Sequence, residues 1–310
     1  MSVKQDVLKT LELHKGESIS GAQLAKELNV SRNAVWKAIN ALKEAGYPIA
    51  SVTGKGYQLS QTSHILSRES INALLPKELP IMVEECVSST NRELMKLAED
   101  GAPNGTVLIA KEQTQGRGHD GHDFYSPKGT GIYLSILIRS EQLLASPRFF
   151  TIAAAVATAK AIESTVGKPV DIKWVNDLFM NGKKVCGILT EGAMDMERGD
   201  FRYIVVGIGI NFCAPKDGFP GDLNQIATGI FSNEKEACDK EIPCIANLLT
   251  QFMSLYDCMK NDDYSFTNEY VKRTLVKGAT HIDHNGYLHY TDVTGTNKLL
   301  RSSRDLTLSK

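Results

Sequence analysis

The order of apolar and polar residues in the first sixty positions is typical of three short helices. Apolar residues at helical spacing predict helices over 3–13 and 24–28. A tight turn at 29–30 and the N-capping hydroxyl of Ser31 then begin a third helix, which ends at Gly46. The apolar face of this third helix consists of Val35, Ile39 and Leu42.

Two short strands are predicted after the third helix. Residues 49–52 and 57–59 have strand character, and the glycine-containing segment 53–56 forms the turn between them. Three helices followed by a hairpin predict a winged helix-turn-helix. The polar segment 60–63 is predicted to be a linker into the next domain.

From about residue 81 the pattern changes to short β-branched strands mixed with helices. The predicted strands cover 106–110, 131–138, 170–173 and 203–210. The predicted helices cover 91–100, 147–165 and 242–260. Alternating residues over 270–310 predict a small all-β segment. The expected fold class is therefore α+β, with domain boundaries at 1–62, 63–268 and 269–310.

Composition narrows the class of protein. The chain has 310 residues, of which 42% are hydrophobic and 23% are charged. These values exclude a disordered or collagen-like chain. The longest mainly apolar stretch, 149–162, is shorter than the roughly 20 residues of a membrane span, and the N-terminus resembles no signal peptide. We therefore expect a soluble cytoplasmic protein that uses no membrane.

The six cysteines contain no C-x-x-C pair and are too sparse for a disulfide framework. They are predicted to be reduced, small apolar core residues, and a structural zinc is not expected. No set of protein metal ligands is predicted.

The N-terminal module differs from the chain as a whole in its net charge, which is positive. Residues 1–60 carry eight Lys and Arg against five Asp and Glu, whereas the whole chain has a net charge of −1. The start of the third helix is predicted to contact DNA, because a helix-turn-helix presents this part to base edges and phosphates. The candidate DNA-binding residues are Ser31, Arg32, Asn33, Trp36 and Lys37. A protein-interaction module with a solvated charged face is the alternative.

A glycine-rich segment is the most informative stretch of the central region. Gly116, Gly118 and Gly121 match a dinucleotide-binding spacing, but Ser126-Pro127 follows where that motif requires a helix. We therefore predict a long loop between strands with Arg117 at its centre, where a guanidinium can bind a carboxylate or phosphate. An incidental arginine in a surface loop is the alternative.

Polar groups also gather at predicted strand ends. The segment 173–177 ends in Asn176-Asp177, and 182–191 forms a second strand after a turn. A third strand, 205–211, contains two glycines where side chains normally pack, which indicates close approach of a flat ligand. Each feature alone is common in proteins, but their order along the chain is distinctive.

Taken together, these motifs resemble the bifunctional biotin-protein ligases, also called biotin operon repressors. The matching segments are Ser89-Thr90-Asn91, Gly105-Thr106, Gly116-Arg117-Gly118 with Ser126-Pro127, Lys173-Trp174-x-Asn176-Asp177, Lys184-x-x-Gly187-Ile188-Leu189-x-Glu191 and Gly207-x-Gly209-Ile210-Asn211. The resemblance covers about residues 3–260. It implies a central mixed sheet with helices on one side, followed by a small SH3-like β domain. The terminal segment of this chain is short, so it has little room for a complete domain of this kind.

The resemblance also implies roles for individual residues. The implied biotin-binding residues are Ser89, Thr90, Asn91, Gln113, Arg117, Gly118, His119, Lys184, Gly207 and Gly209. The implied nucleotide-binding residues are Asn176, Asn211 and Phe124, and the implied catalytic residues are Arg117, Lys184 and Asp177. Biotin, ATP and Mg²⁺ are the implied substrates and cofactor. A biotin carboxyl carrier protein, operator DNA and a second copy of the chain are the implied partners.

The loop departs from the family pattern, which is richer in arginine. His119, Asp120, His122 and Asp123 stand where most of that positive charge is expected. Two other functions therefore stay open at this point. One is a biotin-sensing DNA-binding regulator with weakened catalysis, and the other is a lipoate-protein ligase, which explains neither the N-terminal module nor the loop around Arg117.

Overall fold

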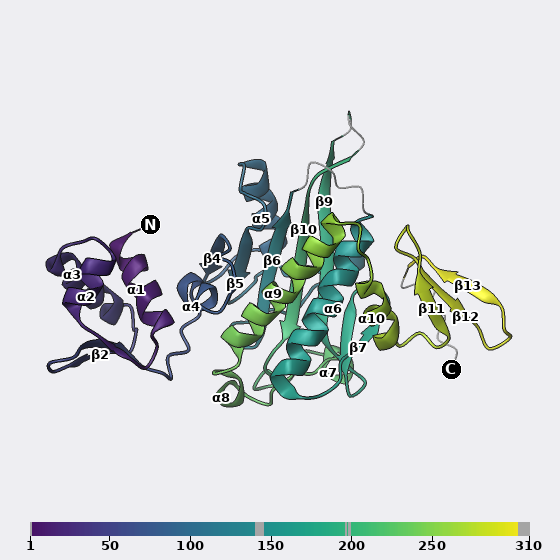
Figure 1. Cartoon of the computed structure of the whole chain (residues 1–310). Coiled ribbons are helices and arrows are strands. Elements are labelled where there is room, and N and C mark those ends of the chain that lie inside the picture. Colours follow the sequence, from purple (N-terminus) through teal and green to yellow (C-terminus); the bar gives the residue numbers. More distant parts are fainter. Residues whose placement is uncertain (1, 140–145, 196, 198–199, 303–310) are drawn as a thin grey trace. The chain divides into compact units, whose positions relative to one another are not determined.

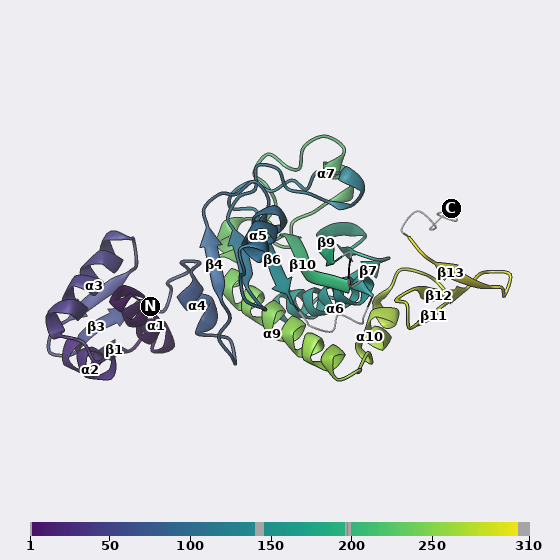
Figure 2. The ribbon, with the colours of Figure 1, turned by 90° about the horizontal axis from the view of Figure 1, so that it is seen from above.

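The computed structural model describes residues 2–139, 146–195, 197 and 200–302. The chain separates into two compact units, Met1–Glu78 and Leu79–Lys310. We describe each unit by itself (Figures 1 and 2).

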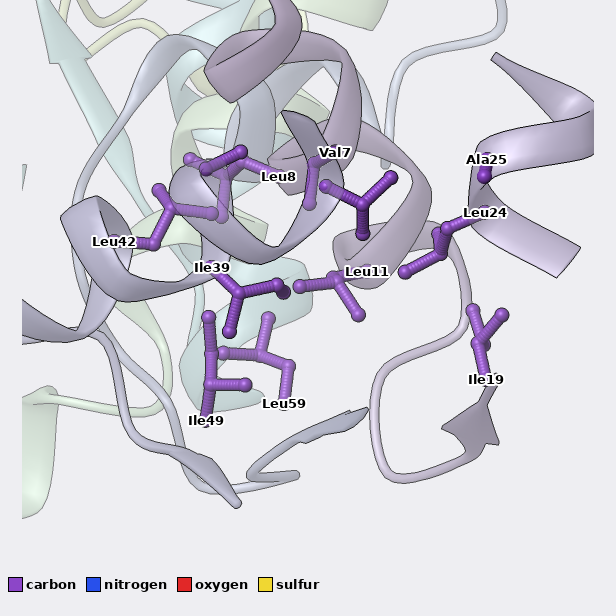
Figure 3. Packing of buried hydrophobic residues seen from close by; sticks show 12 residues of the cluster. Val7, Leu8, Leu11, Ile19, Leu24, Ala25, Ile39, Leu42, Ile49 and Leu59 are labelled. Atoms are coloured by element: carbon purple, nitrogen blue, oxygen red, sulfur yellow. The ribbon is translucent and has the colours of Figure 1, made fainter. Parts of the chain in front are cut away.

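The first unit is the predicted winged helix-turn-helix. Its elements are α1 (Val3–Leu13), β1 (Ser18–Ile19), α2 (Gly21–Glu27), α3 (Arg32–Glu44), β2 (Ile49–Val52), β3 (Gly56–Leu59) and α4 (Arg68–Asn72). The strands form one antiparallel sheet in the order β1-β3-β2. Figure 3 shows the buried core, in which Leu11 and Ile39 from two helices lie close to Leu59 from β3.

Local sequence signals begin and end these helices as predicted. The hydroxyl of Ser31 accepts a hydrogen bond from the backbone N–H of Ala34 at 3.1 Å, which caps α3. Asn29 adopts a φ of 53° in the turn before it. The predicted linker is tied to this unit, because Lys15 Nζ donates to the carbonyl oxygen of Ser63 at 2.6 Å.

The second unit is built on a seven-stranded mixed sheet in the order β4-β5-β6-β10-β9-β8-β7. Its strands are β4 (Ile81–Glu84), β5 (Val107–Ala110), β6 (Gly131–Ile138), β7 (Asp171–Lys173), β8 (Asp177–Met180), β9 (Lys183–Asp195) and β10 (Asp200–Asn211). Only the β4–β5 pair of this sheet is parallel. Five of these strands, β5, β6, β7, β9 and β10, correspond to predicted ones, whereas β4 and β8 were not predicted.

Two long helices cover one face of the sheet, α6 (Pro147–Val166) and α9 (Glu241–Lys260) (Figure 1). Ser146 and Gly167 bound α6, as predicted, and Gly167 adopts a φ of 65°. The helix is long and apolar enough to cross a membrane by composition, but 72% of its apolar window is buried inside the protein. Its alanines are buried and pack closely against their neighbours, as expected of a helix in the core of a globular protein.

A shorter helix, α5 (Thr90–Glu99), packs on the opposite face. Leu94 of α5 belongs to the same buried cluster as Val205 of β10. On α6, the hydroxyl of Thr151 forms a hydrogen bond with the hydroxyl of Thr190 of β9, and Thr190 pairs with Val206 of β10. Successive residues of a strand point to opposite faces, so α5 and α6 lie on opposite sides of the sheet. Two further short helices, α7 (Leu223–Ile226) and α8 (Glu234–Ala237), precede α9.

The C-terminal segment forms a small antiparallel sheet, as predicted, but begins differently. Its strands are β11 (Ala279–Ile282), β12 (Leu288–Thr291) and β13 (Asn297–Leu300). The expectation of strand structure from Tyr270 is wrong, because helix α10 (Phe266–Arg273) contains this residue. Phe266 and Tyr270 lie one helical turn apart and are both buried, so a helical period was misread as alternation. Residues 303–310 of the predicted segment lie outside the described part.

The cysteine prediction is half right. All six thiols are free, and Cys186, Cys213 and Cys244 are buried core residues. Cys86 and Cys238 are exposed, so the expectation of a core position is wrong for them.

Candidate active site

A cavity of about 520 Å³ opens on the face of the sheet that carries α5. The central strands β9 and β10 form its floor, and the glycine-rich loop between β5 and β6 forms one wall. Segment 219–227, which includes α7, lies along another side. Residues from distant parts of the chain therefore meet in one enclosure large enough for a small-molecule ligand.

Every residue predicted to bind biotin or nucleotide lines this cavity. These residues are Ser89, Thr90, Asn91, Gln113, Arg117, Gly118, His119, Phe124, Asn176, Lys184, Gly207, Gly209 and Asn211. Asp177, predicted to be catalytic, lines it as well.

The two glycines of β10 make room for neighbouring side chains. A Cβ atom at Gly207 would lie 2.2 Å from Asn91 Oδ1, and one at Gly209 would lie 2.6 Å from the ring of Phe124. Asn91 comes from α5 and Phe124 from the loop, so glycine lets both pack directly against the sheet. The groups that lie close to these two glycines in the structure are the protein's own side chains, whereas the prediction concerned a flat ligand.

Polar side chains at the start of α5 are linked to the loop. Gln113 Oε1 accepts from the backbone N–H of Thr90 at 2.8 Å, and Gln113 Nε2 donates to Ser126 Oγ at 3.0 Å. Ser126 Oγ in turn donates to the carbonyl oxygen of Phe124 at 2.8 Å. These bonds fix both limbs of the loop beside the pocket.

Three cations line the cavity, Arg117, Lys173 and Lys184, and the first and last of these are paired with carboxylates. Arg117 Nη2 lies 3.2 Å from Glu191 Oε1. Lys184 Nζ lies 2.7 Å from Asp177 Oδ1, an ion pair whose direction is poor for a hydrogen bond. Both pairs are partly exposed, so an anionic ligand can reach them from the cavity.

The hairpin predicted around Gly182 brings Lys184 to the pocket. Strands β8 and β9 pair antiparallel, with Lys184 opposite Phe179, and the Lys184 side chain reaches Asp177, two residues earlier on β8. Lys183, the preceding residue, is exposed, and its Nζ lies 3.4 Å from the carbonyl oxygen of Asn224. Asn176 is fixed to β9 by Nδ2, which donates to the carbonyl oxygen of Ile188 at 3.0 Å.

Burial keeps two other ionisable groups near the site neutral. Desolvation raises the pKa of the Cys186 thiol, and it also raises the pKa of the Tyr133 phenol. Neither group is therefore available as an anionic nucleophile or base near neutral pH.

The loop itself is compact around its glycines. A Cβ atom at Gly116 would lie 2.3 Å from the carbonyl oxygen of Phe124 across the loop. His119 begins a short 3-10 turn, His119–Gly121, and is exposed at the cavity. The Asp120 side chain lies outside the described part of the chain.

Sequence reasoning missed the residues of segment 219–227. Phe219 and Tyr125 form an edge-to-face aromatic contact with ring centroids 6.3 Å apart, and both line the cavity beside Leu223, Ile226 and Ala227. No motif marks this segment. Only its position after the Gly207–Asn211 strand end could have drawn attention to it.

Carboxylates in the described residues do not gather into a metal site. No group of three or more His, Cys, Asp or Glu that could hold a metal ion occurs among them. Asp123 and Asp177 line the cavity and Glu191 lies beside Arg117, and both Asp177 and Glu191 pair with a cation. A hard cation that arrives with phosphate oxygens needs only one or two protein oxygens, which Asp177 and the amides of Asn176 and Asn211 can supply.

In the first unit, the predicted DNA-binding residues share the N-terminal part of α3. Ser31, Arg32, Asn33, Trp36 and Lys37 are all exposed. Trp36 keeps 54% of its surface accessible, which is unusual for a tryptophan.

Comparison with family models supports two modules. Residues 3–58 match a helix-turn-helix domain model, and residues 83–211 match the biotin/lipoate A/B protein ligase family. The chain is 36% identical over 242 residues to the bifunctional ligase/repressor BirA of Bacillus subtilis, which covers 77% of this chain and 74% of that protein. It is 34% identical over 199 residues to the protein of the same name from Escherichia coli, which covers 64% and 61%.

Solved structures share the fold. The biotin protein ligase of Aquifex aeolicus in complex with biotin and ATP superposes with a TM-score of 0.56 at 22% identity, which covers 72% of this chain and 96% of that one. At this level of identity the likeness concerns the fold alone.

Proposed function

The chain belongs to the family of bifunctional biotin ligase/repressors, and we propose on that premise that its cavity holds biotin and ATP side by side. The protein is an ATP-dependent biotin-protein ligase with an attached DNA-binding repressor module. The observation that supports this placement of the substrates is the cavity itself, which brings together the cations Arg117 of the glycine-rich loop and Lys184 of β9.

In the first half-reaction, the biotin carboxylate attacks the α-phosphate of ATP and pyrophosphate leaves. A carboxylate is already ionised at neutral pH, so this step requires no general base. It requires cations, because two anions must approach each other. Arg117 and Lys184 supply that charge, and the loop that carries Arg117 shields the resulting mixed anhydride from water.

In the second half-reaction, a lysine amine of the carrier protein attacks the anhydride and AMP leaves. The incoming ammonium must first lose a proton. Asp177 is the residue that we assign to orient or accept it, because its carboxylate lies beside the cation that binds the adenylate. Asn176, Asn211 and Phe124 bind the nucleotide in this proposal.

Mg²⁺ fits the site only together with ATP. It would be held by phosphate oxygens and by Asp177, Asn176 or Asn211, and it would neutralise phosphate charge when bound. Two protein partners complete the proposal: a biotin carboxyl carrier protein as acceptor, and a second copy of the chain when operator DNA is bound. The division into 1–62, 63–268 and 269–310 and a cytoplasmic location are part of the same proposal.

The decisive test of the enzyme function is biotin-dependent release of pyrophosphate from ATP, followed by transfer of labelled biotin to an isolated carrier domain. Release without transfer, combined with specific operator binding, would favour the second candidate function, a biotin-sensing regulator with weakened catalysis. The observation that favours that candidate is the loop, where His119 and His122 replace the expected arginines.

Arg32→Ala is expected to weaken operator binding by about 1–3 kcal/mol at one base position, if Arg32 reads a guanine. Arg32 is exposed in the first turn of α3, where side chains reach base edges. The measurement is a fluorescence titration of operator and scrambled DNA, with and without biotin and ATP. Equal affinity of the wild type for both DNAs in both conditions would contradict the proposal.

His119→Arg is expected to slow dissociation of the adenylate several-fold, since a permanent charge at the cavity can hold its phosphate. The off-rate is measured by chasing labelled biotinyl-adenylate with unlabelled biotin. The same off-rate in both proteins would show that position 119 does not touch the intermediate.

A further inference from the structure

A series of connected polar side chains extends from the cavity, and Glu191 joins Arg117 of the loop to its buried members. One carboxylate oxygen of Glu191, Oε1, lies 3.2 Å from Arg117 Nη2. The other, Oε2, accepts a hydrogen bond from Asn91 Nδ2 at 2.8 Å. Glu191 is not among the described residues that line the cavity, and it contacts the cavity through Arg117 and Asn91, which do line it.

Asn91 and Ser135 extend the series into the sheet. Asn91 Oδ1 accepts from Ser135 Oγ at 2.6 Å, and Asn91 Nδ2 also donates to the carbonyl oxygen of Leu189 at 3.1 Å. Asn91 is 3% exposed and Ser135 is fully buried. Breaking these bonds without replacement would leave buried polar groups unpaired, which is costly.

The series ends at the polar side of the cavity. Ser135 Oγ lies 2.8 Å from Thr90 Oγ1, and Thr90 is in turn bonded to Gln113. Hydrogen bonds therefore connect Glu191, through Asn91 and Ser135, with the threonine and glutamine that line the pocket, and the ion pair with Glu191 joins the arginine of the loop to this series.

We infer that Glu191 is the positioning residue for Arg117 in the first half-reaction, an inference that rests on the proposed function. Its carboxylate holds one side of the guanidinium against the sheet, and the planar fork then points its remaining donors at the anionic group of the ligand. Because the same carboxylate accepts from Asn91, the orientation of Arg117 is fixed by the buried series.

The charge of Glu191 also has a second effect, which opposes the binding of an anionic ligand. Its negative charge competes with an anionic ligand for Arg117, and if competition dominated, removing the charge would strengthen binding. Glu191→Gln separates the two effects. Arg117 forms an ion pair with one oxygen of the Glu191 carboxylate and Asn91 donates a hydrogen bond to the other, and a glutamine has only one acceptor oxygen, so it cannot serve both.

The first test is a double-mutant cycle on biotin-dependent pyrophosphate release. Glu191→Gln should lower kcat/KM for biotin about tenfold, but less than about twofold in an Arg117→Ala background, because it acts through Arg117. Glu99→Gln is the matched control, because Glu99 also pairs with an arginine, Arg202, at 2.9 Å, and both side chains of this pair are exposed. Unchanged or higher kcat/KM in Glu191→Gln, or a full tenfold loss on top of Arg117→Ala, overturns the inference.

The second test is independent of catalysis. Trypsin cleavage after Arg117 should be about fivefold faster in Glu191→Gln than in the wild type, relative to cleavage after Lys128, because an arginine released from its partner enters a protease more readily. Glu99→Gln should leave this ratio unchanged. An unchanged ratio in Glu191→Gln overturns the positioning role. If the wild type releases no pyrophosphate, the proposed function fails, and the proteolysis result still decides this inference.

Discussion

Replacing Lys184 with alanine should slow biotin-dependent pyrophosphate release by about a hundredfold or more, equivalent to about 3 kcal/mol of transition-state stabilisation. The ammonium lies in the cavity wall, 2.7 Å from Asp177 Oδ1. Its loss removes a cation from the point where carboxylate and phosphate meet, and it leaves the Asp177 carboxylate without its partner. Both changes disfavour the approach of two anions. Rates are measured at saturating ATP and biotin.

Lys183→Ala is the matched control for this experiment. Lys183 is the neighbouring residue on the same strand, but its Nζ points to the carbonyl oxygen of Asn224 on the surface. Lys183 is exposed and is not among the described residues that line the cavity, so this change should leave the rate within about twofold of wild type. Similar, nearly wild-type rates for both variants would remove Lys184 from the reaction and would weaken the assignment of the other residues.

Gly207→Ala should weaken biotin binding by about 2–3 kcal/mol while the sheet still forms. The added Cβ would lie 2.2 Å from Asn91 Oδ1, and Asn91 cannot move freely because Ser135 and Glu191 hold both ends of its amide. The substitution therefore displaces a buried side chain and breaks hydrogen bonds below the cavity. Calorimetric titration with biotin measures the change in affinity, and thermal unfolding reports whether the fold persists.

Gly187→Ala is the corresponding control in the same cavity. A Cβ atom at Gly187 would approach only the edge of the Phe124 ring, at 3.3 Å, and the end of the Lys184 side chain, at 3.4 Å. Both groups can shift by a few tenths of an ångström, so biotin affinity should change by no more than about threefold. Equal losses in the two variants would show that the Asn91 contact is not what makes Gly207 necessary.

Local chemistry in the sequence was sufficient for most elements. Capping by Ser31 and Ser146, and the turn residues Asn29 and Gly167, locate helix ends, because these signals act within a few residues. The winged helix-turn-helix and the hairpin around Gly182 follow from such signals. The helix over 266–273 was partly misread, because short apolar spacings fit both periods and only burial against Trp174 distinguishes them.

The same distinction between local sequence and tertiary structure applies to the candidate site. The sequence by itself determined many of the side chains that lie in the pocket, because their residue types and order match a known family, but it gave no signal for segment 219–227. Only the tertiary structure decided how those side chains are paired. Arg117 and Glu191, or Asn91 and Ser135, are far apart in sequence, and their contacts depend on the order of β6, β10 and β9 in the sheet. Strand order is set by burial of the whole core, which no local pattern encodes.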